Sequence, residues 1–208
     1  MKRILAIAAL ILALGTAAFA NSFGVVAAEY NALDTLAKIN GTDPAAFEDA
    51  DAVKTVGKHV TELDLEKMGI SKIPACIADF VNLRKLDLSG NNITVLPLNF
   101  AKLTKLVDLD LSGNNITALP KNFGGLVSLR ELDLENNNIA VLPDNFMKLK
   151  NLRELDMSGN KLTALPANFS SLTNLRELDI KRNPFKTSPW PVLNKMKNLR
   201  DIECDVKK

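Results

Sequence analysis

The chain has 208 residues, with 26 Lys and Arg against 24 Asp and Glu. Hydrophobic residues make up 47% of it, a composition typical of globular domains rather than of disordered or fibrous chains. The single histidine, His59, leaves almost no material for a Ser-His-Asp triad or a multi-histidine metal site. Composition therefore favours recognition over catalysis, and we expect no enzymatic activity and no cofactor.

The first 20 residues have the layout of a cleavable secretory signal. Lys2 and Arg3 are followed by an apolar run over residues 4–14. The segment then ends in Ala18-Phe19-Ala20, with small residues at the positions that a signal peptidase reads. This run is shorter than the ~20 apolar residues that a membrane span needs. We therefore predict a signal peptide over 1–20 and an exported protein, periplasmic or secreted, with no membrane span in the mature chain.

Residues 21–59 are predicted to form a helical N-terminal cap. Apolar residues recur at helical spacing from about residue 23 to 39, and Asn40-Gly41 is a typical helix end. Asp43-Pro44 has the pattern of a helix start and predicts a second short helix.

From residue 60 onward the sequence repeats every 23 residues. One unit begins Leu-Arg-Lys-Leu-Asp-Leu-Ser-Gly-Asn-Asn-Ile over residues 83–93, followed by Leu96-Pro97 and then by Phe100 and Leu103. This pattern resembles the leucine-rich repeat family over 60–205, with five clean repeats and degenerate ends, and a basic tail over 206–208. The resemblance implies an α/β solenoid: a horseshoe with a parallel concave sheet of about seven short strands and an irregular or short-helical convex side.

Each repeated position has a physical role in such a solenoid. Period-2 alternation turns two leucines of each strand inward, and coils must stack because no single coil can bury its own leucines. A buried asparagine can satisfy backbone groups of its own and neighbouring turns. The ladder asparagines are Asn91, Asn114, Asn137, Asn160 and Asn183. At the same fixed period, the phenylalanines are expected to be core rather than a ligand slot.

The outward positions of the strands form three columns that are strongly acidic. They hold sixteen of the 24 acids and two bases, which leaves 22 bases and eight acids on the rest of the mature chain. The candidate partner-binding residues on this face are Asp87, Asp108, Asp110, Glu131, Asp133, Glu154, Asp156, Glu177 and Asp179. Arginines three residues before the middle acid of most repeats are expected to neutralise it in part. The alternative is that Leu-Arg-x-Leu-Asp-Leu-Ser is simply a common form of this repeat, in which the Arg and Asp serve strand-edge bonding.

This acidic face predicts a non-catalytic protein-protein interaction module whose partner is another, basic protein. The alternative is a structural or adhesive envelope protein that binds divalent cations weakly through shared carboxylates. Nucleic acid is disfavoured because its phosphates would be repelled, and sugars because the columns lack aromatic residues. An enzyme with paired carboxylates is disfavoured because a solvated array lacks the apolar pocket that raises a pKa. We expect a monomer.

The two cysteines are predicted to stay unpaired. Cys76 and Cys204 lie six strands apart, about 29 Å at ~4.8 Å per strand, whereas bridged Cα atoms lie within ~4.4–6.8 Å. Cys204 takes an inward position and is expected to be buried and inert, with Cys76 more accessible. Trp190 is expected to cover the last core layer.

Overall fold

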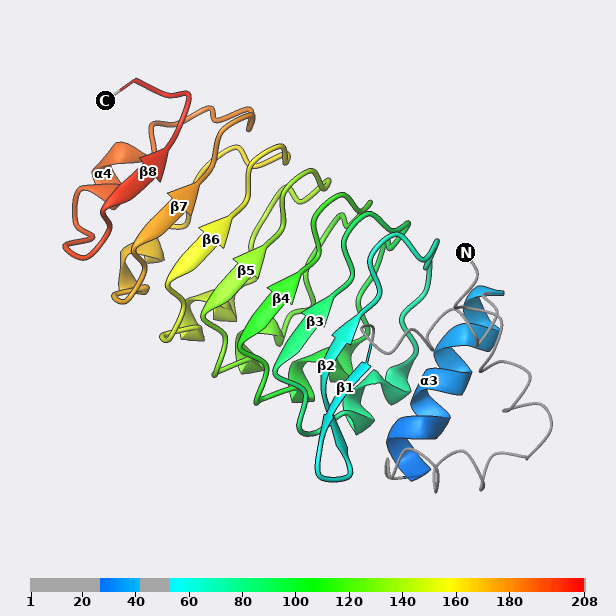
Figure 1. The fold of residues 1–208 in the computed structure, drawn as a ribbon. Helices are drawn as coiled ribbons and strands as arrows, with labels where there is room; N and C mark the ends of the chain where they lie inside the picture. The colour runs from blue at the N-terminus through cyan, green and yellow to red at the C-terminus, as the bar shows by residue number, and fades with distance from the viewer. Residues whose placement is uncertain (1–26, 42–52, 208) are drawn as a thin grey trace.

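The computed structural model describes residues 27–41 and 53–207 of the chain. These residues form a curved solenoid with a sheet of eight strands in chain order (Figure 1). Strands β2 to β8 run parallel, which confirms the seven predicted strands, and β1 pairs antiparallel with β2. The strands are β1 Val53–Val56, β2 His59–Asp64, β3 Lys85–Asp87, β4 Asp108–Asp110, β5 Glu131–Asp133, β6 Glu154–Asp156, β7 Glu177–Asp179 and β8 Asp201–Glu203.

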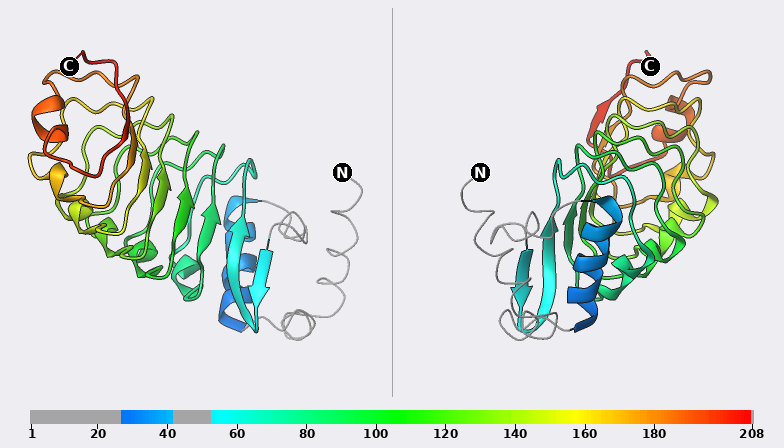
Figure 2. Two further views of the ribbon diagram at one scale, coloured as in Figure 1. Left: turned by 60° about the vertical axis from the view of Figure 1, so that its left-hand side comes forward. Right: turned by 90° about the vertical axis from the view of Figure 1, so that its right-hand side faces the viewer.

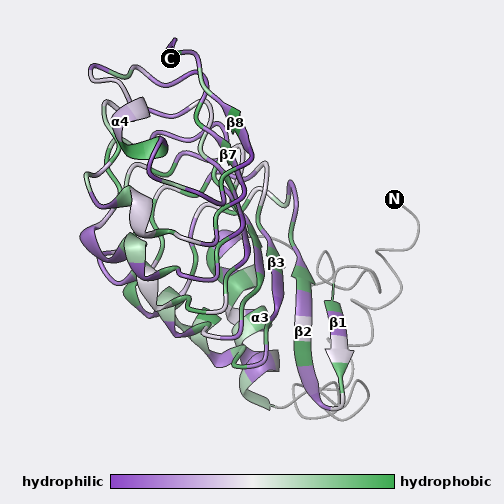
Figure 3. Ribbon diagram, turned by 90° about the vertical axis from the view of Figure 1, so that its left-hand side faces the viewer, coloured by the Kyte–Doolittle hydropathy of each residue, from purple (hydrophilic) through white to green (hydrophobic). Residues whose placement is uncertain are grey.

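The register of the sheet repeats the 23-residue period of the sequence. The central leucine of each strand pairs with that of the next, as Leu86 does with Leu109 and Leu109 with Leu132. These leucines are at most 2% exposed, and hydrophilic and hydrophobic residues alternate along strands such as β2 (Figure 3). Successive coils therefore stack without a shift, and each outward column becomes a line of neighbouring side chains.

The convex side carries one short 3-10 helix in each of five coils, opposite the strands (Figure 2). Pro97 has a φ of −69°, and its carbonyl accepts the N–H of Phe100 at 3.0 Å to close the first turn. The repeated phenylalanines are fully buried, and the rings of Phe123 and Phe146 stack with centroids 6.1 Å apart, which confirms their core role. The helices are η2 Ala75–Asp79, η3 Leu98–Lys102, η4 Phe123–Gly125, η5 Asp144–Lys148 and η6 Phe169–Ser171.

The N-terminal end of the core is covered by helix α3, Ala27–Asn40, close to the predicted bounds. Its apolar face buries Leu36 and Ala37, and Asn40 Oδ1 accepts the N–H groups of Ser71 and Lys72 at 2.8 and 2.9 Å. The predicted signal peptide and second short helix lie outside the described residues. Within the range 21–59 predicted as the helical cap, residues 53–56 form strand β1, which the sequence analysis did not predict, and the Gly57-Lys58 turn leads into β2.

The C-terminal end is covered by helix α4, Trp190–Leu193, before strand β8. The ring of Trp190 packs on the core, and its Nε1–H donates to the Val206 carbonyl at 2.7 Å, as expected for a cover. Cys204 is half-buried, so its predicted full burial is wrong; it follows directly after β8, the last strand of the described sheet. Cys76 is also half-buried and free, and burial against α3 raises the pKa of its thiol.

Candidate functional site

The outward column that begins each strand is a continuous line of side chains on the concave face. The structure pairs Asp108 with Glu131, Glu131 with Glu154, and Glu154 with Glu177 as direct neighbours across parallel strands. At one end, Lys85 donates to Asp108 Oδ2 at 2.6 Å, which neutralises that acid. In the described part of the chain, the three glutamates make no ion pair and no side-chain hydrogen bond, and all three are exposed.

The electrostatic consequence of this stacking is visible at Glu154. Partial burial, followed by the negative charges of Glu131 and Glu177 on either side, raises the pKa of Glu154. Arg153 opposes this shift but does not contact the carboxylate. The three unpaired glutamates therefore form a part of the face where a cationic ligand would relieve repulsion between neighbouring carboxylates.

The middle column has a structural role at the ends of the strands, as the strand-edge alternative predicts for its aspartates. Each aspartate from β2 to β7 accepts, at Oδ1, the backbone N–H of the residue two positions later, at 2.7–3.1 Å. In two repeats the serine hydroxyl also donates to the same oxygen, as Ser89 does to Asp87 at 2.7 Å. The signal was an aspartate two residues before the turn, which is a common arrangement for side-chain-to-backbone bonds. These aspartates hold the strand end as well as carrying charge.

Asp133, at the centre of this column, departs from the expectation of a fully solvated array. Burial is the main cause that raises its pKa from 3.8 to about 7, and the charges of Asp110 and Asp156 add to it, while the hydrogen bond from the Glu135 N–H opposes it. Burial also raises the pKa values of Asp87 and Asp156. The expectation that no carboxyl on this face has a raised pKa is therefore wrong.

Two cations lie on the face after β7: Lys181, which the sequence places in the third column, and Arg182, which sequence reasoning did not place there. Arg182 Nη2 donates to Glu135 Oε1 at 2.5 Å and to Ser158 Oγ at 3.3 Å, so it reaches back across two coils. Lys181 forms ion pairs with Asp179, at 3.6 Å, and with Glu203. These two cations offset part of the negative charge near β7 and β8, and the unpaired glutamates of the first column lie on β5 to β7.

Arg182 reaches this position because of the backbone turn that follows each strand. The residue at this point has a positive φ in every coil: it is glycine in three coils, and Lys67, Asn136 and Arg182 elsewhere, with φ of 53–54°. Glycine accepts this left-handed conformation without cost, whereas other residues do so rarely. Arg182 stands where three other coils have this glycine, and that substitution was the sequence signal for its unusual position.

The ladder asparagines hold adjacent coils together below this face. Asn137 is typical: its Oδ1 accepts the N–H of Ile116 at 2.9 Å, and its Nδ2 donates to the carbonyls of Leu111 and Leu134 at 2.9 and 3.2 Å. The same three bonds recur at the other ladder positions, at 2.8–3.1 Å. They are made by Asn91, Asn114, Asn160 and Asn183.

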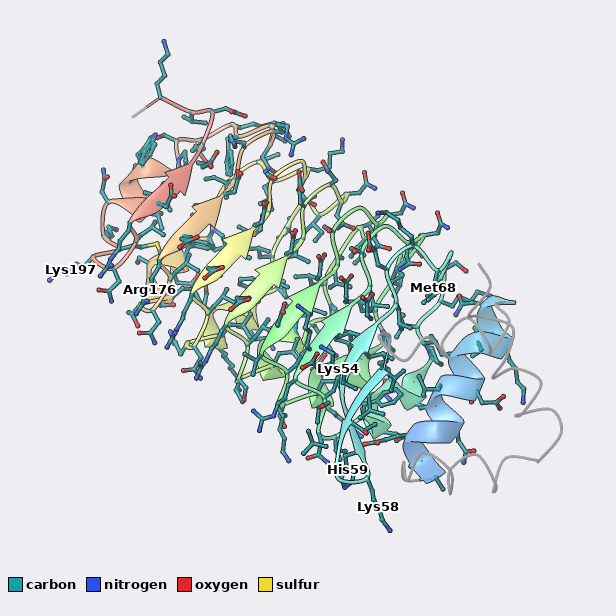
Figure 4. The ribbon with its side chains drawn as sticks, viewed as in Figure 1. Lys54, Lys58, His59, Met68, Arg176 and Lys197 are labelled. Atoms are coloured by element: carbon teal, nitrogen blue, oxygen red, sulfur yellow. The ribbon has the colours of Figure 1, made fainter. Side chains whose placement is uncertain are left out.

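The arginines do not neutralise the middle acids by contact. They are exposed, and in the part of the chain that the structure describes none of them forms a side-chain hydrogen bond or an ion pair. They lie one residue before each strand, at the edge where the strands begin, as the labelled Arg176 shows (Figure 4). The residues in question are Arg84, Arg130, Arg153, Arg176 and Arg200.

These features define a solenoid of stacked repeats with a parallel concave sheet. The leucine rich repeat family model matches residues 81–139 and residues 132–185, which together span half of the chain, and the chain belongs to this family. Comparison with curated protein sequences gave no significant match. Among the described residues, no helix has the length and apolar character required to cross a membrane.

Solved structures of the same fold include bacterial and plant proteins. A leucine-rich repeat protein of Leptospira interrogans is 30% identical with a TM-score of 0.66, over 71% of this chain and 38% of that one. The plant peptide hormone receptor RGFR1, solved with RGF2, is 31% identical with a TM-score of 0.63, over 69% and 24% of the two chains. The ectodomain of the Arabidopsis receptor kinase HAESA, solved with an IDA peptide hormone, is 26% identical with a TM-score of 0.66, over 74% and 27%. The chain thus spans well under half the length of each.

Proposed function

We propose that this protein is an exported, non-catalytic binding module that captures a basic protein on its acidic concave face. The observation that carries the proposal is the line of exposed, unpaired glutamates at Glu131, Glu154 and Glu177, held in direct register by the parallel strands. The register fixes these charges about 4.8 Å apart. A partner that places Lys or Arg side chains along this line would remove their mutual repulsion.

The chemistry of the face supports protein as the ligand class. A curved sheet offers an extended binding surface, and solvated charge of one sign steers a partner of opposite sign and speeds its association. RGFR1 and HAESA, which share the fold, were each solved with a peptide hormone. Export, the signal peptide over 1–20, the cap over 21–59 and the repeat domain over 60–205 complete the proposal and rest on the sequence.

The nine candidate acids do not contribute equally under this proposal. Asp108 is paired with Lys85, and the middle aspartates are tied to the backbone of their own turns. Reversing Asp110, Asp133 and Asp156 to Lys would therefore disturb the turns as well as the charge. The glutamates of the first column can be changed without loss of any described bond, so they are the better test.

The experiment measures the dissociation constant of a fluorescent lysine-rich peptide by anisotropy, with the full chain at 50 mM and 500 mM salt. Glu131→Lys/Glu154→Lys is compared with Asp79→Lys/Asp144→Lys, which makes the same charge change at exposed positions on the convex side. We expect the first variant to weaken binding at least about tenfold at low salt and the second to weaken it far less, because the peptide contacts only the concave face. Equal weakening in both variants would show that only net charge matters and would refute the site.

A second candidate function is cation binding by the carboxylates over β5 and β6. Oxygen atoms of Asp133, Glu135 and Asp156 lie within 4.8 Å of one another, close enough to share one Ca²⁺ at ligand distances of ~2.3–2.6 Å. The guanidinium of Arg182 already contacts Glu135, however, and competes with an ion for that oxygen. For this reason we rank the cation role second.

The cation role is tested by thermal melts of the full chain with EDTA and then with millimolar Ca²⁺, in 0.5 M salt. If the cluster binds Ca²⁺, the melting temperature rises, because an ion that binds only the folded state stabilises it. The rise should be larger in Arg182→Ala, where the competing cation is gone. A melting temperature that Ca²⁺ does not change in either protein would exclude this candidate.

A further inference from the structure

A second charged surface, of opposite sign, runs along the edge where the strands begin. Arg84, Arg130, Arg153, Arg176 and Arg200 form this arginine row, and their backbones are joined directly from coil to coil. The N–H of Arg153 donates to the Arg130 carbonyl, that of Arg176 to Arg153 and that of Arg200 to Arg176, each at 2.8 Å. Figure 4 shows Arg176, Lys197 and His59 along this same edge, whereas Met68 lies at the opposite one. The row is therefore a fixed line of cations beside the acidic face, not part of it.

The guanidinium groups of the row have no partner in the described part of the chain. All five side chains are exposed and form no side-chain hydrogen bond or ion pair there. Like charges at the spacing of neighbouring strands repel, so this row carries an electrostatic cost that an anion would remove. The molecule thus presents two lines of opposite charge that offset each other only in part, as Arg153 does for Glu154 without contacting it. The proposed concave site uses only one of the two lines.

The row is interrupted once, at Val107, and a hollow of about 420 Å³ lies at the interruption. The neighbouring Arg84 and Arg130 are two strand spacings apart, about 10 Å at the backbone, which leaves room for one tetrahedral oxyanion between their side chains. The residues that line the hollow are Arg84, Lys105, Val107, Ser128, Arg130 and Asn151. They supply three cations and a hydroxyl donor, and no carboxylate.

A second hollow, of about 320 Å³, extends this site toward β2 and shares Arg84 and Lys105 with the first. Lys105 is held between the two, because its ammonium donates to Asn82 Oδ1 at 2.6 Å. The one acid that lines the second hollow, Glu62, is neutralised by Lys54 at 2.5 Å. The positive potential of Arg84 and Lys105 is therefore not cancelled on this side.

We propose that the strand-start edge binds a linear polyanion that carries sulfate or phosphate groups, with its principal site in the hollow between Arg84 and Arg130. A guanidinium matches a tetrahedral oxyanion with two parallel hydrogen bonds, and two guanidiniums facing one hollow can hold one such group from both sides. The polymer then continues past Arg153, Arg176 and Arg200, one strand spacing at a time.

The surroundings of the row select this ligand over other polyanions. No aromatic ring lines the hollow, so the bases of a nucleic acid would have no platform to stack on. The acidic face begins one residue after each arginine, so a flat anionic membrane would meet its repulsion as well. A slender chain that lies along the outer side of the edge faces fewer of these acids than a flat membrane does.

The test measures anisotropy of fluorescein-labelled heparin with the full chain, with unlabelled polyphosphate as the competitor. Arg84→Gln/Arg130→Gln is compared with Lys121→Gln/Lys161→Gln, which removes two exposed charges that line neither hollow. We expect a loss of affinity of at least about tenfold in the arginine variant and of less than about twofold in the lysine control. In a plot of log affinity against log salt concentration, the slope of the arginine variant should be smaller in magnitude by about one to two, because two ion contacts are lost.

Both variants should melt at the wild-type temperature, since the changed side chains make no described contact. If polyphosphate at equal charge displaces the labelled heparin, the site accepts phosphate groups. If polyphosphate does not displace heparin that is bound, the site is specific for sulfate groups. Equal losses in the arginine variant and the lysine control would overturn the site. Equally tight binding of single-stranded DNA, or arginine-dependent sedimentation with phosphatidylserine vesicles, would overturn the ligand class.

Discussion

The asparagine ladder makes a prediction that can be worked out bond by bond at Asn137. In Asn137→Ala, the N–H of Ile116 loses its acceptor, and Ile116 is fully buried, so water cannot replace the lost bond without entering the core. The carbonyls of Leu111 and Leu134 lose one donor each but keep a second, from Asn114 at 3.0 Å and Asn160 at 2.8 Å respectively. Only one backbone group is therefore left without a partner.

These losses set the expected magnitude. An orphaned buried N–H costs about 1–3 kcal/mol, and two weakened bonds to carbonyls that keep other donors add about 1 kcal/mol in total. We therefore expect Asn137→Ala to lower the free energy of unfolding by about 2–4 kcal/mol. The matched control is Asn138→Ala, the same chemical change at the next residue, where the side chain is exposed and only the backbone N–H is bonded, to the Ile116 carbonyl.

The assay is urea denaturation followed by far-ultraviolet circular dichroism for wild type and both variants. Asn138→Ala should change the free energy of unfolding by less than about 0.5 kcal/mol, the usual range for surface substitutions. If Asn137→Ala loses no more stability than Asn138→Ala, the ladder does not hold the coils together in the way described.

Three further predictions concern stability elsewhere in the chain. Gly124→Ala should lower the melting temperature, since an added Cβ would overlap the backbone of Asn145, whereas Ser170→Ala at the same repeat position should have little effect. Glu29→Ala should lower the free energy of unfolding in urea by about 1–3 kcal/mol. The buried Glu29 carboxylate accepts the buried backbone N–H of Val60 at 2.8 Å, and the substitution leaves that N–H without a partner. In the folded protein Asp133 has a pKa of about 7, above its ordinary 3.8. The protonated side chain therefore contributes to the free energy of unfolding fully below pH 3.8, and this contribution is lost as the pH rises through 7. Asp133→Asn, which cannot ionise and keeps the turn acceptor, should gain stability over wild type between pH 4 and pH 8, and an unchanged difference across that range would contradict the raised pKa.

The 23-residue period carries most of the fold, because stacked coils repeat one local structure. It places the strands, the convex helices and the buried phenylalanines, since each depends on residues of its own coil and the next. The period cannot describe the ends. Strand β1 forms because it pairs with β2, and Glu29 is buried because it accepts the N–H of Val60, 31 residues away. Cys204, directly after the last described strand, is half-buried although its repeat position is an inward one.

The candidate site was predictable in its charge but not in its detail. Residue types and register were enough to place the acids in lines. Which acids are free to bind a partner and which are bonded to the backbone depends on side-chain geometry. Glu131, Glu154 and Glu177 of the first column are exposed and unpaired, whereas the aspartates of the middle column are tied to the turns. Long side chains that cross coils, such as Arg182 to Glu135, also lie beyond a repeat-by-repeat analysis.

The central claim is that the concave face, over β5 to β7, is the surface that binds a basic partner. Its most direct test is an NMR titration of the isotope-labelled full chain with the lysine-rich peptide at 50 mM salt. Chemical shifts should change first and most at Glu131, Glu154 and Glu177, and they should return to their free values at 500 mM salt. Changes confined to the convex side, around Asp79 and Asp144, would contradict the account.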